Sequence, residues 1–247
     1  MSGQGGFDAG ALSGVVVVCG HYGVGKTALS LSLSMDAAAR GKRVRLIDLD
    51  VVNPYFRSSD ERAELAHAGV SLVAPVYSGS TCNIDMPALS GAVIPAIEAA
   101  RADEADGAGA LSIIDVGGDD AGAFALGRFS RVISQGPYQM LYVVNRCRAL
   151  TQTADAAAGV LADIEAACRL RATGVVNNSH LMDDTTADDV SASVPFACEV
   201  ARTAGVPLAF QAVASGVLSA APQLEGELAA TAPVYRMQPY RQTPWSC

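Results

Sequence analysis

The feature that most constrains this chain is a glycine-rich loop at residues 20–27, which reads Gly-His-Tyr-Gly-Val-Gly-Lys-Thr. It matches the pattern G-x-x-x-x-G-K-[ST], in which backbone N–H groups surround a polyphosphate. The apolar run at 15–19 leads into the loop and is typical of a buried parallel strand. A helix is predicted at 26–39. Strand, glycine-rich turn and helix in this order predict a phosphate-binding loop, called here the phosphate loop.

The residue types in the phosphate loop predict separate roles. Three glycines let the backbone approach the phosphates. The ammonium of Lys26 is predicted to contact the β- and γ-phosphates, and the Thr27 hydroxyl to bind Mg²⁺. A chance glycine-rich turn before a helix is the alternative, and the flanking strand and helix argue against it. The predicted nucleotide-binding residues of this region are Gly20, His21, Tyr22, Gly23, Val24, Gly25, Lys26, Thr27 and Ala28.

Apolar, β-branched runs alternate with helix-length segments along most of the 247 residues. Such alternation predicts an α/β fold in three layers, with a mainly parallel sheet of about seven strands and helices on both faces. We expect a flexible leader at 1–13, one nucleotide-binding domain at 14–222 and a proline-interrupted tail at 223–247. Strands are predicted at 14–19, 43–48, 71–74, 110–115, 140–145, 173–177 and 207–213, and helices at 26–39, 58–68, 86–102, 120–134, 151–170 and 186–204.

Carboxylates follow two of the predicted strands. Asp48 and Asp50 end the second strand, and Asp115 ends the fourth. Ligands of open parallel sheets bind at the carboxyl ends of the strands, and an apolar run followed by Asp is typical of a Mg²⁺ partner. Asp115 is therefore predicted near the metal, although an Asp at a strand end is often only a helix cap. Gly117 and Gly118 are predicted to move as a switch that senses the γ-phosphate.

Four segments together carry a resemblance to a known family. They are the phosphate loop and residues 48–50, 115–118 and 175–178, which read Asp-Leu-Asp, Asp-Val-Gly-Gly and Val-Val-Asn-Asn. The chain resembles the CobQ/CobB/MinD/ParA group of P-loop NTPases over about residues 15–213, and within it the MinD-like bacterial ATP-binding proteins most. The resemblance implies the P-loop NTPase fold, binding of ATP and Mg²⁺, and slow hydrolysis that a partner regulates.

The resemblance also implies roles for individual residues. Asp50 would position the attacking water and, with Lys26, would be catalytic. The metal set would be Thr27, Asp48 and Asp115, with the two carboxylates acting near Mg²⁺ through water.

Further implied contacts concern the base and the partner subunit. Gly118 would lie at the nucleotide, and Asn177 would hydrogen-bond the adenine, because an amide offers both a donor and an acceptor. At the position of His21, the proteins that this chain resembles carry a lysine. That lysine reaches across a nucleotide-sandwich dimer. His21 either supplies a weaker cation or packs beside the loop. Arg57 and Arg146 are other candidates for a cation acting on a partner subunit, or form structural ion pairs.

Composition excludes some functions. The net charge of −8 and the pI of about 4.8 argue against broad nucleic-acid binding. The C-terminal segment is broken by proline, so no membrane anchor is expected there. The cysteines have no C-x-x-C spacing, which favours reduced thiols in the cytoplasm over an iron–sulfur or zinc site; they stand at 19, 82, 147, 168, 198 and 247.

The leading hypothesis is a cytoplasmic Mg²⁺-dependent ATPase that acts as a nucleotide-dependent switch on an unidentified protein partner. A homodimer is one form of this switch, and analogy suggests cofactor or metalloenzyme maturation as the setting. The alternative is an ATP-dependent ligase of the dethiobiotin synthetase or cobyrinate amidase type, with residues 77–85 lining a substrate pocket or a partner surface. A polynucleotide or sugar kinase is a third. The absence of an N-K-x-D motif favours ATP over GTP.

Overall fold

The computed structural model describes residues 6–50, 59–74, 86–105 and 109–238. The strands of this part form one sheet in the order β3-β2-β4-β1-β5-β6-β7-β8, and neighbouring strands run parallel throughout. The prediction of a mainly parallel α/β sheet is confirmed, with eight strands instead of about seven. The strands are β1 Gly14–Cys19, β2 Arg43–Leu49, β3 Val70–Val73, β4 Ala110–Val116, β5 Tyr138–Val144, β6 Gly174–Asn177, β7 Leu208–Ala214 and β8 Val234–Met237.

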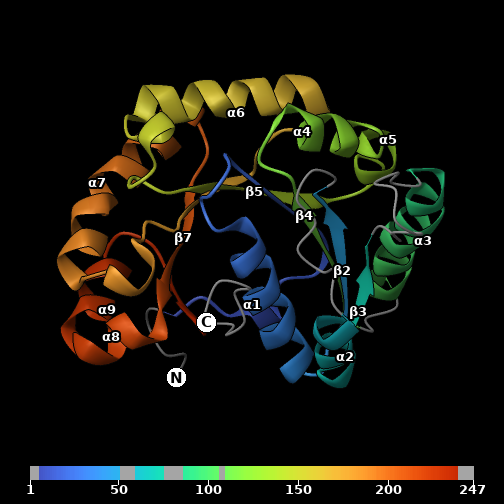
Figure 1. Ribbon diagram of the computed structural model, residues 1–247, viewed down its shortest axis with the longest axis horizontal. Coiled ribbons are helices and arrows are strands. Elements are labelled where there is room, and N and C mark those ends of the chain that lie inside the picture. The colour runs from blue at the N-terminus through green and yellow to red at the C-terminus, as the bar shows by residue number, and fades with distance from the viewer. Residues whose placement is uncertain (1–5, 51–58, 75–85, 106–108, 239–247) are drawn as a thin grey trace.

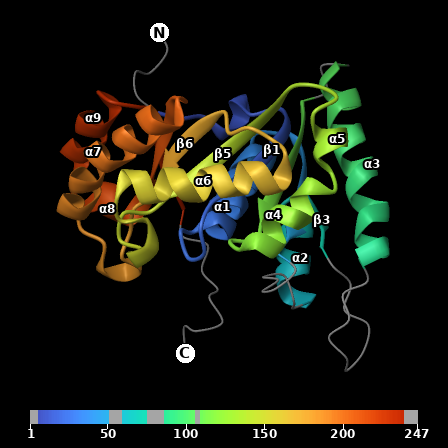
Figure 2. The same ribbon diagram turned by 90° about the horizontal axis from the view of Figure 1, so that it is seen from above.

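Helices cover both faces of the sheet. In Figure 1, α6 runs along one side with α4 and α5, and α1 lies on the other side; Figure 2 shows the same layers from above. Parallel strands need such helical connections, because the chain must return to the same end of the sheet before each strand begins. The helices are α1 Lys26–Ala39, α2 Ser59–His67, α3 Met86–Ala105, α4 Asp120–Gly127, α5 Ser130–Ile133, α6 Ala154–Cys168, α7 Ala187–Ala204, α8 Ser215–Ala220 and α9 Pro222–Ala229.

The central strand β1 explains why its sequence is apolar throughout. Every residue of β1 is buried, and the side chains alternate between two cores. Val15 and Val17 pack in the core beneath α3, α4, α6 and α7. Val16 and Val18 pack against α1 in the core of the opposite face. A strand buried on both faces has no polar side, as expected for the middle of a parallel sheet.

The eighth strand lies in the segment 223–247, which the sequence predicted to be an unpatterned tail. Val234–Met237 instead pairs in parallel with β7. The Tyr235 ring is buried and meets the rings of Phe7 and Phe210 edge to face, while Phe7 stacks on Phe210 with centroids 4.0 Å apart. Thus residues from both ends of the described chain close this end of the sheet. The division into leader, domain and tail otherwise stays a prediction.

One predicted helix is interrupted. The segment 120–134 forms α4 and α5, separated at Arg128 and Phe129. A Cβ on Gly127 would lie 2.8 Å from the Ala167 carbonyl oxygen, so α4 ends where its backbone closely approaches α6. The buried Phe129 ring fixes the turn between the two pieces. Tertiary packing therefore overrides the helical pattern at this point.

Two other helices begin at their capping residues. α6 starts after Thr153, whose hydroxyl accepts a hydrogen bond from the backbone N–H of Ala156. α7 starts after Thr186, which forms a capping box with Asp189. Arg57 and the segment 77–85, for which we weighed functional roles, lie outside the described residues, as do Cys82 and Cys247. Among the helices that the structure describes, none has the length and hydropathy needed to cross a membrane.

Candidate functional site

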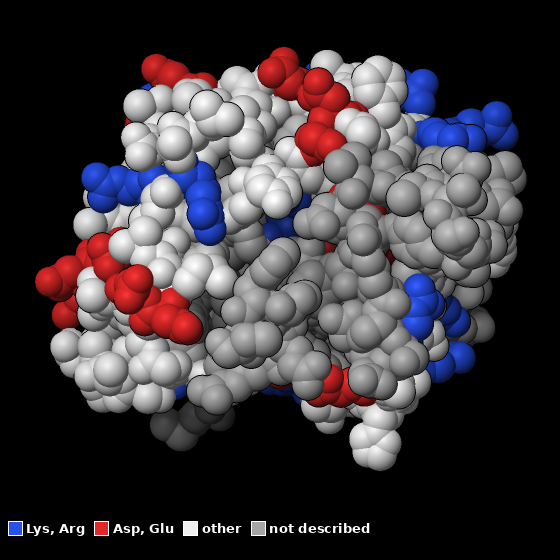
Figure 3. Space-filling model, in the orientation of Figure 1, with Lys and Arg blue, Asp and Glu red and all other residues white. Residues whose placement is uncertain are grey.

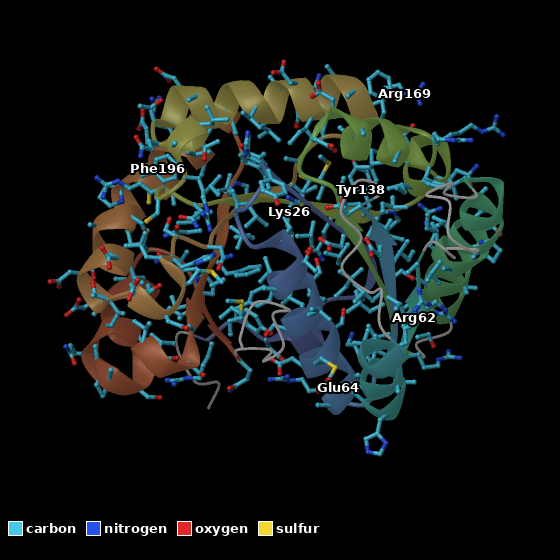
Figure 4. All side chains as sticks on the ribbon, viewed as in Figure 1. Lys26, Arg62, Glu64, Tyr138, Arg169 and Phe196 are labelled. Atoms are coloured by element: carbon cyan, nitrogen blue, oxygen red, sulfur yellow. The ribbon has the colours of Figure 1, made fainter. Side chains whose placement is uncertain are left out.

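The phosphate loop joins the carboxyl end of β1 to α1 in the middle of the sheet. Figure 4 shows Lys26 near the centre of the molecule, at the start of α1. Gly20, Gly23 and Gly25 have φ values of 147°, 75° and 88°, a region that favours glycine. Gly25 is the N-cap of α1, and a Cβ there would lie 2.4 Å from Asn178 Nδ2. The glycines thus permit both the turn and its close contact with the loop after β6.

Lys26 is held inside this loop. Its side chain is buried, and its Nζ donates a 3.0 Å hydrogen bond to the carbonyl oxygen of His21. Burial lowers the pKa of Lys26, and the nearby carboxylates of Asp115 and Asp50 oppose that shift. The ammonium therefore lies between the backbone of the phosphate loop and the carboxylates of Asp50 and Asp115, and its contact with phosphate stays a prediction.

The predicted carboxylates meet at the carboxyl ends of neighbouring strands. Asp48 on β2 is in register with Asp115 on β4, and both are buried. Asp48 Oδ1 accepts a 2.9 Å hydrogen bond from the backbone N–H of Asp50. Asp115 Oδ1 accepts from Ser30 Oγ at 3.3 Å. The fold thus brings together two strand ends that are 67 residues apart in the sequence.

The chemistry of this group fits a magnesium ion. Burial raises the pKa of Asp115 to about 6, while the Thr27 hydroxyl and the Lys26 ammonium lower it. Asp115 Oδ2 is buried and makes no hydrogen bond to any side chain or backbone group that the structure describes. Together with Asp48, it provides hard oxygen donors. Mg²⁺ prefers such oxygens and completes its shell with phosphate and water.

The loop after β4 lies directly on the phosphate loop. A Cβ on Gly118 would lie 2.6 Å from the backbone N and Cα of Tyr22 and 2.7 Å from Lys26 Nζ. A Cβ on Gly117 would lie 3.3 Å from Asp50 Oδ1. At Gly118 a Cβ would collide with the backbone of the phosphate loop, so only glycine leaves room there. The two residues that the sequence proposed as a switch therefore contact the two residues that it proposed as catalytic.

The structure gives Asn177 a different environment from the one expected for a base-reading residue. Its Nδ2 donates to Ser193 Oγ at 2.9 Å and to Gln211 Oε1 at 3.3 Å. Its Oδ1 accepts from the backbone N–H and the hydroxyl of Ser179. All four hydrogen-bonding positions of the amide are therefore occupied inside the protein. The contact with adenine stays a prediction, and it would require these bonds to rearrange.

Asn178, the next residue, contacts the phosphate loop, which the sequence analysis did not predict. Asn178 is buried, and its Nδ2 donates a 2.8 Å hydrogen bond to the Val24 carbonyl oxygen. Asn145, at the end of β5, is also buried and ties this region together, because its Oδ1 accepts from the backbone N–H groups of Cys147 and His180. The sequence did carry a signal, because Asn stands at the end of each of two apolar strands. Of the adjacent Asn177 and Asn178, we predicted a role in the site only for Asn177.

The remaining loop residues differ in exposure. Tyr22 is 63% exposed, Val24 is buried, and Ala28 is exposed on the first turn of α1. His21 Nδ1 donates to the Tyr22 carbonyl oxygen at 3.2 Å, so its ring packs on the loop in this conformation. Arg146, one candidate for a cation acting on a partner, donates from Nη1 to the Ala192 carbonyl oxygen at 2.8 Å.

Metal and surface chemistry give two further observations. Across the described ranges, no three His, Cys, Asp or Glu side chains group to hold a metal, and Cys19, Cys147, Cys168 and Cys198 are free thiols. On the face drawn in Figure 3, basic side chains stand in separate groups in the part that the structure describes. These groups do not form the continuous basic surface that broad nucleic-acid binding uses.

The chain is similar to several known proteins. The chain spans 28% of the length of a curated relative, the cytosolic Fe-S cluster assembly factor CFD1 of Yarrowia lipolytica, with 32% identity over 85 residues, or 33% of this chain. Among solved structures, the cell division protein FtsY of Thermotoga maritima superposes with a TM-score of 0.52 and 21% identity, over 82% of this chain and 62% of FtsY.

A second solved structure supports the same fold. The signal recognition particle 54 kDa protein of Aeropyrum pernix, in complex with GDP, also has a TM-score of 0.52, with 16% identity over 79% of this chain and 40% of that chain. At this identity the likeness concerns the fold alone. The model of the CobQ/CobB/MinD/ParA nucleotide binding domain matches residues 15–204, more than half of the sequence. The chain therefore belongs to the CobQ/CobB/MinD/ParA family of P-loop nucleotide-binding proteins.

Proposed function

We propose that this protein is a Mg²⁺-dependent ATPase that acts as a nucleotide-dependent switch on a protein partner. The observation that supports this most directly is the contact of Gly118 with Tyr22 and Lys26. Phosphates bound in the phosphate loop would meet the loop after β4 at this contact. Loss of the γ-phosphate would then release Gly118 and change the start of α4, as γ-phosphate-dependent segments do in other switches.

The chemical roles follow from the positions of the side chains. Lys26 would neutralise charge on the β- and γ-phosphates, and Asp50 would orient the attacking water. Thr27, Asp48 and Asp115 would hold Mg²⁺ directly or through water. When bound, this ion supplies charge neutralisation to the phosphates. With a buried lysine already at the loop, catalysis would depend on positioning and electrostatics more than on covalent chemistry.

We propose ATP as the nucleotide. The loop after β5 reads Asn-Arg-Cys-Arg at 145–148 and contains no carboxylate. Guanine presents N–H donors that the carboxylate of an N-K-x-D motif accepts, and the sequence contains no such motif. Adenine needs no carboxylate acceptor.

The partner would bind at the edge of the sheet that carries the nucleotide. The large apolar side chains that are exposed in the described structure all follow β1, β4, β5 or β6, which are neighbours in the sheet; they are Tyr22, Phe124, Leu150, Leu181 and Met182. Exposed apolar groups gathered around one site are typical of protein contacts. A second copy of the chain, or another protein, would cover this edge.

The setting that we propose is cofactor or metalloenzyme maturation in the cytoplasm. Its support is the likeness to a protein described as a cytosolic Fe-S cluster assembly factor. The cysteines that the structure describes do not form a cluster site, so this chain would act on a partner that holds the cofactor.

Light scattering with and without ATP and Mg²⁺ tests the switch. We expect ATP to change the mass of the wild-type protein, or its affinity for a partner, and to leave Lys26→Ala unchanged. A mass indifferent to nucleotide, with binding established separately and turnover that requires a small carboxylate substrate, would contradict the switch and favour the ligase. Phosphate transfer to a hydroxyl would favour a kinase instead.

A further inference from the structure

Arg148 lies on the phosphate loop, although it is more than a hundred residues from the loop in the sequence. It follows β5, and a Cβ on Gly23 would lie 3.5 Å from its Nε and 3.6 Å from its Cζ. The guanidinium therefore packs on the glycine at the centre of the loop.

The charge of Arg148 has no counterpart in the described structure. Its Nε is buried without a hydrogen-bond partner, and no ion pair joins it to a described carboxylate. Lys26 differs, because Asp115 and Asp50 lie near enough to act on its pKa. The Arg148 side chain is half-buried, so its charge still meets solvent, but a buried N–H donor without a partner is costly. A guanidinium kept against an anion-binding loop at that cost indicates that an anion completes the site.

His180 also lies against the phosphate loop, but it is uncharged, so Arg148 is the charged group on this side of the loop. His180 Nδ1 accepts a 3.2 Å hydrogen bond from the backbone N–H of Met182, so the neutral ring carries its proton on Nε2. Nε2 lies 3.0 Å from the position of a Cβ on Gly25. Burial, with a smaller contribution from Arg148, lowers the pKa of His180 to about 4. The histidine is therefore a neutral packing partner at pH 7.

We propose that Arg148 binds the phosphate oxygens of the nucleotide in the phosphate loop, from within the same chain, as a second cation beside Lys26. The proposal rests on the proposed nucleotide-binding function. It also accounts for His21, which stands where the resembling proteins have a lysine and here packs on the loop. A guanidinium suits this task because its fork of donors matches the geometry of phosphate oxygens.

Three variants isolate the contact. Arg148→Ala removes it, and Arg148→Lys keeps the charge. Arg202→Ala is the matched control, because Arg202 is an exposed arginine whose guanidinium pairs with Glu199 on α7. Binding of a fluorescent ATP analogue with Mg²⁺ is measured for each, and inorganic tripolyphosphate is used as the competitor. Thermal unfolding shows that each variant folds, and Arg148→Gln replaces the alanine variant if that one does not.

We expect Arg148→Ala to weaken the binding of the ATP analogue and of tripolyphosphate by the same factor, roughly 10- to 100-fold, the loss for a hydrogen bond to a charged group. Arg148→Lys would recover part of the loss, and Arg202→Ala would stay within about twofold of wild type. Unchanged binding in Arg148→Ala, with the wild type binding normally, would overturn this proposal alone. A loss for the ATP analogue but not for tripolyphosphate would overturn the assignment to phosphate. A wild-type protein that binds neither compound would overturn the proposed function as well.

Discussion

The side-chain amide of Asn178 donates a 2.8 Å hydrogen bond to the carbonyl oxygen of Val24, so the loop after β6 supports the phosphate loop from behind. The two residues are 154 positions apart, and both are buried. A loop that must present its N–H groups to phosphates has to keep its carbonyl groups satisfied elsewhere. Asn178 does this at the residue before Gly25.

Replacement of Asn178 should therefore affect both stability and binding. In Asn178→Ala the Val24 carbonyl oxygen loses its donor, which should lower the free energy of unfolding by roughly 1–3 kcal/mol. Nucleotide affinity should also fall, because the loop is less well held. Urea denaturation and nucleotide titration measure the two effects. Ser112→Ala is the control, since Ser112 is equally buried but its hydroxyl donates to the Ala96 carbonyl oxygen on α3. Equal affinity losses in both variants would contradict the specific role of Asn178.

Gly118 should not tolerate a side chain. A Cβ there would lie 2.6 Å from the Tyr22 backbone, so Gly118→Ala must displace the phosphate loop or the loop after β4. We expect at least a tenfold loss of nucleotide binding or hydrolysis, by analogy with the cost of small displacements at catalytic sites. Gly159→Ala is the control: nothing lies within 4 Å of its Cβ position in α6, and helix propensity should stabilise it by about 0.5–1 kcal/mol. Wild-type hydrolysis in Gly118→Ala would refute the contact.

Asp115 should make stability depend on pH in a particular direction. Its pKa is raised by burial to about 6, from 3.8, so the folded protein holds this proton more tightly than the unfolded chain. The contribution of Asp115 is therefore most favourable below the unfolded pKa and is lost as pH rises toward 6. Asn remains neutral throughout. Asp115→Asn should be more stable than wild type at pH 7.5, by roughly 1–3 kcal/mol.

The test is urea denaturation of wild type and Asp115→Asn over a pH series. The difference between the two proteins should shrink as pH falls from about 6.5 to 4. Asp120→Asn, an exposed change on α4, should show no such trend. A wild-type protein that is the more stable of the pair at pH 7.5 would show that Asp115 is held by interactions that outweigh its burial.

A substitution on β8, at one end of the sheet, should change the free energy of unfolding without changing nucleotide affinity. The buried Tyr235 hydroxyl lies 2.8 Å from Ser32 Oγ and donates to Asp36 Oδ2 at 3.0 Å, which joins β8 to α1. Tyr235→Phe should cost roughly 1–2 kcal/mol of unfolding free energy and leave nucleotide affinity unchanged. Tyr138→Phe, which removes a hydroxyl in a more exposed place, should cost less. Thermal unfolding and nucleotide titration distinguish these results, and a tenfold loss of affinity in Tyr235→Phe would contradict a purely structural role.

Local sequence predicted the structure correctly where a residue type has a single physical reason to occupy its position. The apolar run before the phosphate loop is buried on both faces, as a central parallel strand must be. Asp48 and Asp115 follow such runs, and the parallel arrangement alone brings strand ends of this kind to one edge. These features depend on periodicity and on chain direction, which the sequence carries directly.

Local sequence predicted the structure poorly where strand pairing or side-chain packing decides the conformation. Val234–Met237 lies just after a proline in a segment without clear alternation, and it becomes a strand because β7 offers an open edge and Tyr235 a place among Phe7 and Phe210. Similarly, the helical pattern around Gly127 continues past the point where contact with α6 ends the helix.

Local sequence was sufficient to predict the phosphate loop, the burial of β1 and the carboxylates near Lys26, because each follows from local chemistry on a parallel sheet. The groups that surround these residues depend on the tertiary structure. Asn177 turns into the protein and bonds to Ser193 and Gln211, whereas Arg148 approaches Gly23 from a loop far away in the sequence. The physical reason is that hydrogen bonds and charges are satisfied by whichever group lies within a few ångströms, and such neighbours are set by how the whole chain packs.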